Sequence, residues 1–328
     1  MTILRFLTLT RYFEHYSKIS HRPQYSHILL LIHSLVWRRF QNFQSLLRFI
    51  RANQLQGGSL AFQDSEFPGI EGLIVCAPKD FPLLSMCVDS LVENSMNPVL
   101  KVSIIVPDAS INLCEEQVSS ARNRDLVKIV PESGLLNTSS LSLLKSKFPQ
   151  GHGWVLQQFL TISFCSQSEQ AGVLAINADT MLLRKQAWLS DLGNQVLMVS
   201  SEFHEPYYEL LSKMNPRLRD RSRTFITHHM LFQPRLLNQF LSDLGYHNAS
   251  ELLERTLELT DYSVVSPICM EFEFYAQHMM LLHPGRVQLR KFANVGVSRG
   301  TGLSPEAILE NFKTMALYNS ISMHSWMD

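Results

Sequence analysis

The sequence has few cysteines, and none is spaced for a metal centre or a redox pair. The five are Cys76, Cys87, Cys114, Cys165 and Cys269, an odd number scattered along the chain. This pattern argues against a disulfide-stapled secreted domain and against a cysteine-ligated zinc site. Buried, reduced thiols in a reducing compartment are the predicted alternative.

Long hydrophobic runs are also missing. The most apolar early stretch, Ile28 to Trp37, contains His33 and Ser34 and reaches about half the length of a membrane span. The N-terminus does not show the charged, apolar and small-residue succession of a signal peptide. We therefore expect a cytoplasmic protein without a transmembrane helix.

The chain carries no net charge, and 45% of its 328 residues are hydrophobic while 18% are charged. Such a composition excludes wholesale disorder and is sufficient for one large α/β domain or two smaller ones. Positive charge is not clustered in the body of the chain, which argues against nucleic-acid binding. The sequence leaves the oligomeric state open.

The charge is unevenly distributed, because residues 1–60 hold eight Lys or Arg against one acid, a net charge of +7. Within this basic arm, Phe40, Phe43, Leu47 and Ile50 recur at three- and four-residue steps and predict an amphipathic helix. Its basic border could bind an anionic membrane surface, making the protein peripheral at the inner membrane face. Docking of the helix on the protein's own body is the open alternative.

Beyond a Gly-containing linker, the chain alternates between strand and helix patterns. Residues 73–77 form a strand-like run, residues 83–91 have helical periodicity, and residues 102–106 form a second strand-like run. This succession predicts a βαβ unit with parallel strands. We expect an α/β fold with a mostly parallel central sheet and flanking helices, in a domain spanning residues 67–328.

The stretch from Val173 to Leu183 organises the domain. Its first residues are apolar and typical of a strand buried on both faces, and Asn177 and Asp179 follow directly. Ligands bind at the carboxyl ends of strands in such sheets, and one or two carboxylates there commonly hold Mg²⁺ together with phosphate oxygens. Asn177 and Asp179 are therefore either a cation and nucleotide site or simple turn formers.

Five pieces of the chain carry a resemblance to a known family. They occupy residues 153–158, 176–180, 225–232, 270–275 and 321–325 and read GWVLQQ, INADT, FITHHMLF, MEFEFY and ISMHS. In this order they resemble the GT-A-type nucleotide-diphospho-sugar glycosyltransferases, most closely a group of largely uncharacterised bacterial GT-A-like proteins. The resemblance spans roughly residues 70 to 328, and its INADT string stands where that family has its Asp-x-Asp motif.

The resemblance implies a metal-dependent glycosyltransferase that moves a sugar from a nucleoside-diphosphate sugar to a glycan or other cell-surface acceptor. Asp179 and His324 would hold Mn²⁺ or Mg²⁺, and a tail position for His324 alternatively implies a frayed surface residue. Asn177 stands where the family has its first Asp. Its uncharged amide could contact the ribose, or could lie near the metal and contact it through water. Because of this substitution, a second interpretation stays open, in which the protein is a non-catalytic module that binds nucleotide or glycan without turnover.

Further residues are assigned to the donor and the acceptor. The donor-binding candidates are Pro78, Lys79, Asp80, Asp108, Gln157, Gln158 and Asn177. Asp80 and Asp108 each follow a strand and would meet the base and ribose, or would cap turns. Ala77-Pro78-Lys79-Asp80 lacks the Gly-rich phosphate loop expected of a nucleotidyltransferase.

The acceptor-side candidates are two carboxylates in an apolar and aromatic setting. Glu271 or Glu273 would take the proton of the acceptor hydroxyl if the transfer inverts the configuration of the sugar. The two would share a face in a strand but not in a helix. Met270 stands where the family pattern has Ser, so the acceptor side is expected to differ. Of the adjacent His228 and His229, at most one can reach a site.

Overall fold

The computed structural model describes residues 67–149, 151–200, 202–218, 220–262, 268, 271–314 and 317–325. The basic arm, residues 1–60, lies outside this set, so its amphipathic helix and its membrane partner stay predictions. Among the residues described, no helix is long and apolar enough to cross a membrane.

A five-stranded sheet forms the centre of the fold, in the order β3-β2-β1-β4-β7. Its members are β1 (Ile70–Val75), β2 (Val99–Val106), β3 (Val127–Pro131), β4 (Val173–Ile176) and β7 (His229–Phe232). The first four strands run parallel, and β7 pairs antiparallel with β4 at one edge. The predicted α/β class, with a mostly parallel central sheet and flanking helices, is confirmed.

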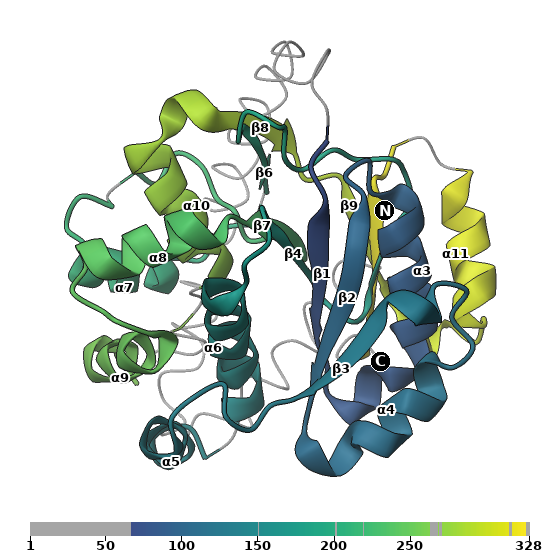
Figure 1. Cartoon of the computed structure of the whole chain (residues 1–328), viewed down its shortest axis with the longest axis horizontal. Coiled ribbons are helices and arrows are strands. Elements are labelled where there is room, and N and C mark those ends of the chain that lie inside the picture. Colours follow the sequence, from purple (N-terminus) through teal and green to yellow (C-terminus); the bar gives the residue numbers. More distant parts are fainter. Residues whose placement is uncertain are drawn as a thin grey trace, which may run out of the picture.

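Helices cover both faces of this sheet (Figure 1). The α-helices are α3 (Leu84–Asn94), α4 (Ile111–Val118), α5 (Thr138–Lys147), α6 (His152–Gln167), α7 (Glu205–Met214), α8 (Pro234–Asp243), α9 (Ala249–Leu259), α10 (Glu271–Leu282) and α11 (Pro305–Lys313). Successive strand residues point to opposite faces, so Leu73 packs on the α6 side while Ile74 packs on the α3 side. The apolar runs of the strands follow from this double burial.

The central stretch, residues 173–183, forms two strands joined by a turn. β4 ends at Ile176, a turn closes through the Thr180 N–H donating to the Asn177 carbonyl at 2.9 Å, and β5 (Thr180–Leu182) follows. A further two-stranded sheet pairs β6 (Gln195–Val199) with β8 (Val287–Lys291) in parallel. The turn between β4 and β5 thus carries Asn177 and Asp179 at the carboxyl edge of the central sheet.

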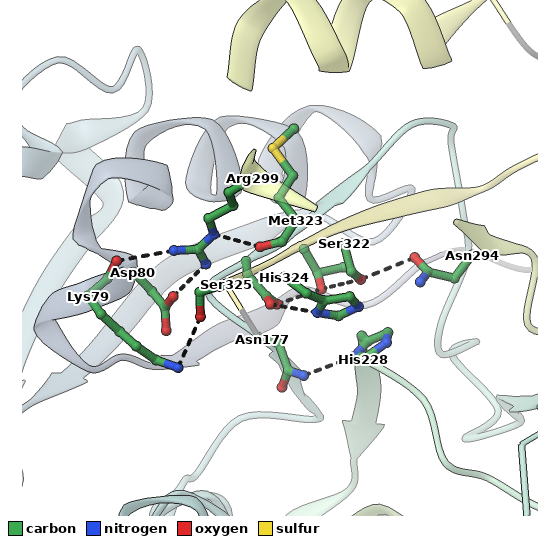
Figure 2. A network of polar contacts seen from close by, with 12 residues as sticks. Lys79, Asp80, Asn177, His228, Asn294, Arg299, Ser322, Met323, His324 and Ser325 are labelled. Atoms are coloured by element: carbon green, nitrogen blue, oxygen red, sulfur yellow. Dashed lines mark hydrogen bonds and ion pairs between the residues drawn. The ribbon is translucent and has the colours of Figure 1, made fainter. Parts of the chain in front are cut away.

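The end of the chain is held against β5. Strand β10 (Ser320–His324) lies between β5 and β9 (Asn294–Ser298), antiparallel to the first and parallel to the second. The buried Ser322 hydroxyl lies 2.8 Å from the Thr180 hydroxyl and 3.3 Å from Asn294 Oδ1 (Figure 2). These bonds fix the register of β10. His324 is therefore an ordered strand residue and not the frayed tail position that was the alternative.

Candidate functional site

Asp179 and His324 meet at the carboxyl edge of the central sheet. The Met323 N–H donates to the Asp179 carbonyl at 2.8 Å, which extends the pairing of β10 with β5 up to the turn. This pairing sets His324 Nδ1 at 3.1 Å from Asp179 Oδ2, although 145 residues separate the two along the chain (Figure 2). Both side chains are largely buried, with exposed fractions of 9% and 19% for His324 and Asp179.

The electrostatic surroundings keep Asp179 ionised. Burial raises the pKa of its carboxyl, but the hydrogen bond and charge of His324 lower it, and His228 and Arg299 lower it further. The net result is a pKa below the ordinary value, because the hydrogen bond from His324 and the neighbouring charges together outweigh desolvation. The site therefore offers a carboxylate at neutral pH.

Asn177, two residues earlier, points into the same cluster and is held on both sides. Gln157 of α6 donates through Nε2 to Asn177 Oδ1 at 3.4 Å, and Asn177 Nδ2 lies 3.1 Å from His228 Nδ1. Burial lowers the pKa of His228 to about 4, so its ring is neutral at pH 7 and Nδ1 can accept from the Asn177 amide. The His228 and His324 ring centroids are 5.1 Å apart.

The neighbouring His229 faces away from this cluster. Residues that follow each other in extended chain point to opposite sides, and the His229 ring meets Trp188 edge-on with centroids 5.0 Å apart. Burial lowers the pKa of His229 to about 3. At most one of the two adjacent histidines was expected to reach a site, and His228 is the one whose ring lies against Asn177 and His324.

Arg299 links the loop after β1 to the end of β10. Its guanidinium donates to the Met323 carbonyl at 2.7 Å, to the Lys79 carbonyl at 3.1 Å and to Asp80 Oδ1 at 2.5 Å (Figure 2). Lys79 is exposed and reaches the Ser325 hydroxyl with Nζ at 3.4 Å. The sequence analysis missed Arg299 because nothing in its local pattern points to a partner more than 200 residues away.

The Asp179 and His324 pair suits a hard divalent cation. Ligands at adjacent corners of an octahedral ion with bonds of 2.0–2.1 Å are about 3 Å apart, close to the 3.1 Å between the two donor atoms. Within the described part of the chain, no group of three or more His, Cys, Asp or Glu side chains is placed to hold a metal. A cation here would need the phosphate oxygens of a ligand, which is how Mg²⁺ is usually bound.

The remaining donor-side candidates lie in different settings. Pro78 opens the short helix η4 (Pro78–Leu83), and Asp80 within it is engaged by Arg299. Asp108 accepts from the Ser133 hydroxyl at 2.5 Å and the Ser133 N–H at 3.2 Å, and these bonds lower the pKa of its carboxyl. Asp108 thus joins the turn after β2 to the segment after β3. Gln158 is buried within α6 and donates to the Trp154 carbonyl at 3.4 Å.

The two acceptor-side carboxylates begin helix α10 and therefore do not share a face. Glu273 is fully buried and accepts from the Tyr208 hydroxyl, the Thr224 hydroxyl and the Phe225 N–H. Burial raises the pKa of Glu273 more than these bonds lower it. This arrangement makes Glu273 an anchor between α10 and the segment around α7. Glu271, 9% exposed at the helix start, stays the predicted base.

Comparisons with known proteins find solved structures that are distantly similar to this chain. No protein-family model and no curated protein sequence matches it. The chain is similar to the galactosyltransferase LgtC in complex with donor and acceptor sugar analogs, with a TM-score of 0.44 and 10% identity over 77% of this chain and 86% of LgtC. An active-site mutant of LgtC is similar with a TM-score of 0.44 and 11% identity, over 77% of this chain and 86% of the mutant. Mouse xyloside xylosyltransferase 1, apo form, is similar with a TM-score of 0.41 and 10% identity, over 79% of this chain and 99% of that one.

Proposed function

We propose that this protein is a metal-dependent glycosyltransferase that moves a sugar from a nucleoside-diphosphate sugar to a glycan or other cell-surface acceptor. The observation that carries the proposal is the 3.1 Å approach of His324 Nδ1 to Asp179 Oδ2 at the carboxyl end of β4. Ligands of α/β sheets bind at this edge. The INADT and ISMHS strings that resemble the family are the two segments that meet there.

Asp179 and His324 would hold a divalent cation, Mn²⁺ or Mg²⁺, with the phosphate oxygens of the donor. When bound, such a cation would supply positive charge that offsets the negative charge of a leaving diphosphate. Lys79 adds a second positive group, because its exposed ammonium lies against Ser325, the residue after His324. Charge-assisted hydrogen bonds from such an ammonium to phosphate are among the strong ones.

Asn177 and Gln157 orient the donor on the other side of Asp179. The bond from Gln157 to Asn177 joins helix α6 to the turn after β4, and both amides have further hydrogen-bonding capacity for sugar or ribose hydroxyls. The neutral ring of His228 holds the Asn177 amide from the opposite side. Glu271 is the proposed base that takes the acceptor hydroxyl proton when the reaction inverts.

Calorimetric titration of the full chain with UDP, GDP, CDP and ADP, each with and without Mn²⁺, tests this proposal. We expect one nucleotide to bind only with the metal, Asp179→Ala to abolish that binding, and His324→Ala to weaken it less. Asp125→Ala and His247→Ala, at exposed positions of other elements, are matched controls. Undiminished binding in Asp179→Ala would overturn the assignment of this site. Release of nucleoside diphosphate from nucleotide sugar then separates a transferase from a non-catalytic binding module.

A further inference from the structure

An aromatic patch lies next to the candidate site and is formed by the exposed Trp154 together with the half-buried His204 and the buried Tyr207. Trp154, near the start of α6, is 42% exposed and its ring centroid lies 6.5 Å from that of Tyr207 at an interplanar angle of 34°. The Tyr207 ring in turn meets His204 edge-on with centroids 4.5 Å apart. Large aromatic side chains bury much area when they bind, so a tryptophan left in solvent is an informative feature.

A hydrogen bond from helix α6 places this patch beside the Asp179 and His324 pair. Trp154 and Gln157 are three residues apart on α6 and share a helix face, and Gln157 donates to Asn177. On α7, the ring of Tyr207 lies against that of Trp154. The patch therefore adjoins the cluster on the side of α6 and α7.

Lys79 and Asp80 lie on the opposite side of the same cluster. They follow β1, whose helix α3 covers the other face of the sheet from α6 (Figure 1). The proposed diphosphate contact at Lys79 and the aromatic patch thus approach Asp179 from two different halves of the fold. The half that contains the patch remains for the second substrate.

The patch is held in place from below by buried groups. Tyr208, next to Tyr207 in the first turns of α7, stacks on Phe203 with centroids 4.8 Å apart and an interplanar angle of 19°. Its hydroxyl donates to the buried Glu273 at 2.9 Å. This anchoring fixes the start of α7, so the buried Tyr207 gives the exposed Trp154 ring a fixed neighbour, which lowers the ordering cost when a ligand binds.

We propose that Trp154, with Tyr207 and His204, forms the subsite for a pyranose ring of the acceptor, an inference that rests on the proposed function. A pyranose has an apolar face of C–H groups, which packs on the negative face of an aromatic ring, and a rim of hydroxyls. Polar groups for such a rim are also present, because Gln157 lies one helical turn from Trp154 on α6 and His204 belongs to the patch. Sites for small ligands combine an aromatic lining with a few such polar groups.

Saturation-transfer NMR on the full chain tests the subsite with the methyl pyranosides of galactose, glucose and N-acetylglucosamine as probes. We expect at least one to bind the unmodified protein, Trp154→Ala to weaken its binding about tenfold or more, and Trp154→Phe to retain most of it. Tyr262→Ala is the matched control, because Tyr262 is 41% exposed but contacts Phe148 and Lys147 instead. Each variant is also titrated with nucleotide and Mn²⁺, where no change is expected.

Three outcomes overturn the subsite. Equal saccharide binding by Trp154→Ala and the unmodified protein would remove the tryptophan from it. Binding of no pyranoside by a protein that binds nucleotide would remove the subsite and leave the proposed function standing. Weaker nucleotide binding in Trp154→Ala, with saccharide binding intact, would assign the ring to the donor base. Conversely, pyranoside binding that depends on Trp154 in a chain that binds no nucleotide would support a saccharide site and overturn the proposed function alone.

Discussion

Arg299 and Asp80 form an ion pair across a 2.5 Å contact between Nη2 and Oδ1, and the pair joins the loop after the first strand to the last strand of the described fold. Both side chains are largely buried, with exposed fractions of 19% and 17%. Because Arg299 also holds the Met323 carbonyl, its position sets that of His324, the next residue. The pair therefore positions a proposed metal ligand without touching the metal.

Replacing Arg299 should loosen this arrangement. We expect Arg299→Ala to lower the free energy of unfolding by about 2–3 kcal/mol, because the Asp80 carboxylate and the Met323 carbonyl each lose a hydrogen-bond donor. Affinity for Mn²⁺ with nucleotide should fall about tenfold. Arg299→Lys should lie in between, since an ammonium cannot reproduce the three-way fork. Urea denaturation and calorimetry measure the two effects.

Arg255→Ala is the matched control for that experiment. Its ion pair with Glu258, at 2.9 Å, joins two exposed side chains within one helix, and such pairs contribute about 0–1 kcal/mol. Equal losses of stability in the two variants would show that the Arg299 pair contributes no more than a surface contact.

Asn177→Asp should tighten binding of Mn²⁺ about tenfold, because it adds a second full charge next to Asp179. The same change removes the amide group that donates a hydrogen bond to His228 Nδ1, so the His228 ring must rearrange. Asn177→Ser, which keeps a small polar group without charge, is the control. Unchanged metal affinity together with weaker nucleotide binding would assign Asn177 to the ribose instead.

Glu273 should prove structural and not catalytic. Glu273→Gln keeps an acceptor for Tyr208, Thr224 and the Phe225 N–H, so we expect a folded protein with unchanged nucleotide binding and turnover. Glu273→Ala leaves these donors unsatisfied and opens space, which should cost about 3 kcal/mol or more. Thermal unfolding and turnover are measured for both. A folded Glu273→Gln protein without turnover would restore the catalytic assignment.

Stability should fall with acid through buried neutral histidines. Burial lowers the pKa of His278 to about 4, against the ordinary 6.5, while Asp243 raises it slightly and Arg217 lowers it. The unfolded chain therefore takes up a proton that the folded chain resists. The contribution of His278 to the free energy of unfolding is constant above pH 6.5. It declines by about 3 kcal/mol as the pH falls from 6.5 to 4.

His278→Asn tests that sign. The amide can still donate to the Phe274 carbonyl, which His278 Nδ1 meets at 2.7 Å, but it does not titrate. The variant should be less stable at pH 7.5 yet lose less stability than the unmodified protein on acidification to pH 5, by urea denaturation at each pH. His247→Asn, at an exposed histidine, should follow the unmodified protein. Parallel pH profiles for all three proteins would contradict a neutral His278.

The basic arm should bind an anionic membrane surface. Its net charge of +7 and its apolar stripe predict that the full chain pellets with vesicles containing anionic lipid and is released as salt rises. A chain that lacks residues 1–60 should stay in the supernatant. Equal pelleting of both forms would place the attraction elsewhere in the molecule.

Local pattern predicted the frame of the site and missed its long-range contacts. Val173–Ile176 is apolar throughout because both faces of β4 are covered, and this made the position of Asp179 predictable. The resemblance, and not periodicity, indicated His324. Arg299 and His228 act through partners far along the chain, which no spacing rule encodes. The glutamates at 271 and 273 were left between strand and helix, and tertiary burial made them helical.

Strand β10 has a consequence for the order in which the protein matures on the ribosome. The central sheet is complete once β7 has been synthesised, whereas β10 must still be inserted between β5 and β9. Domains fold as their residues emerge, beginning from the N-terminus. A nascent chain in which β10 has not yet emerged thus has its central sheet, but lacks the core cluster around Ile321 and Met323 and the His324 half of the proposed cation site. If Asp179 and His324 hold a cation as proposed, such a chain would not bind metal and nucleotide until β10 has been inserted.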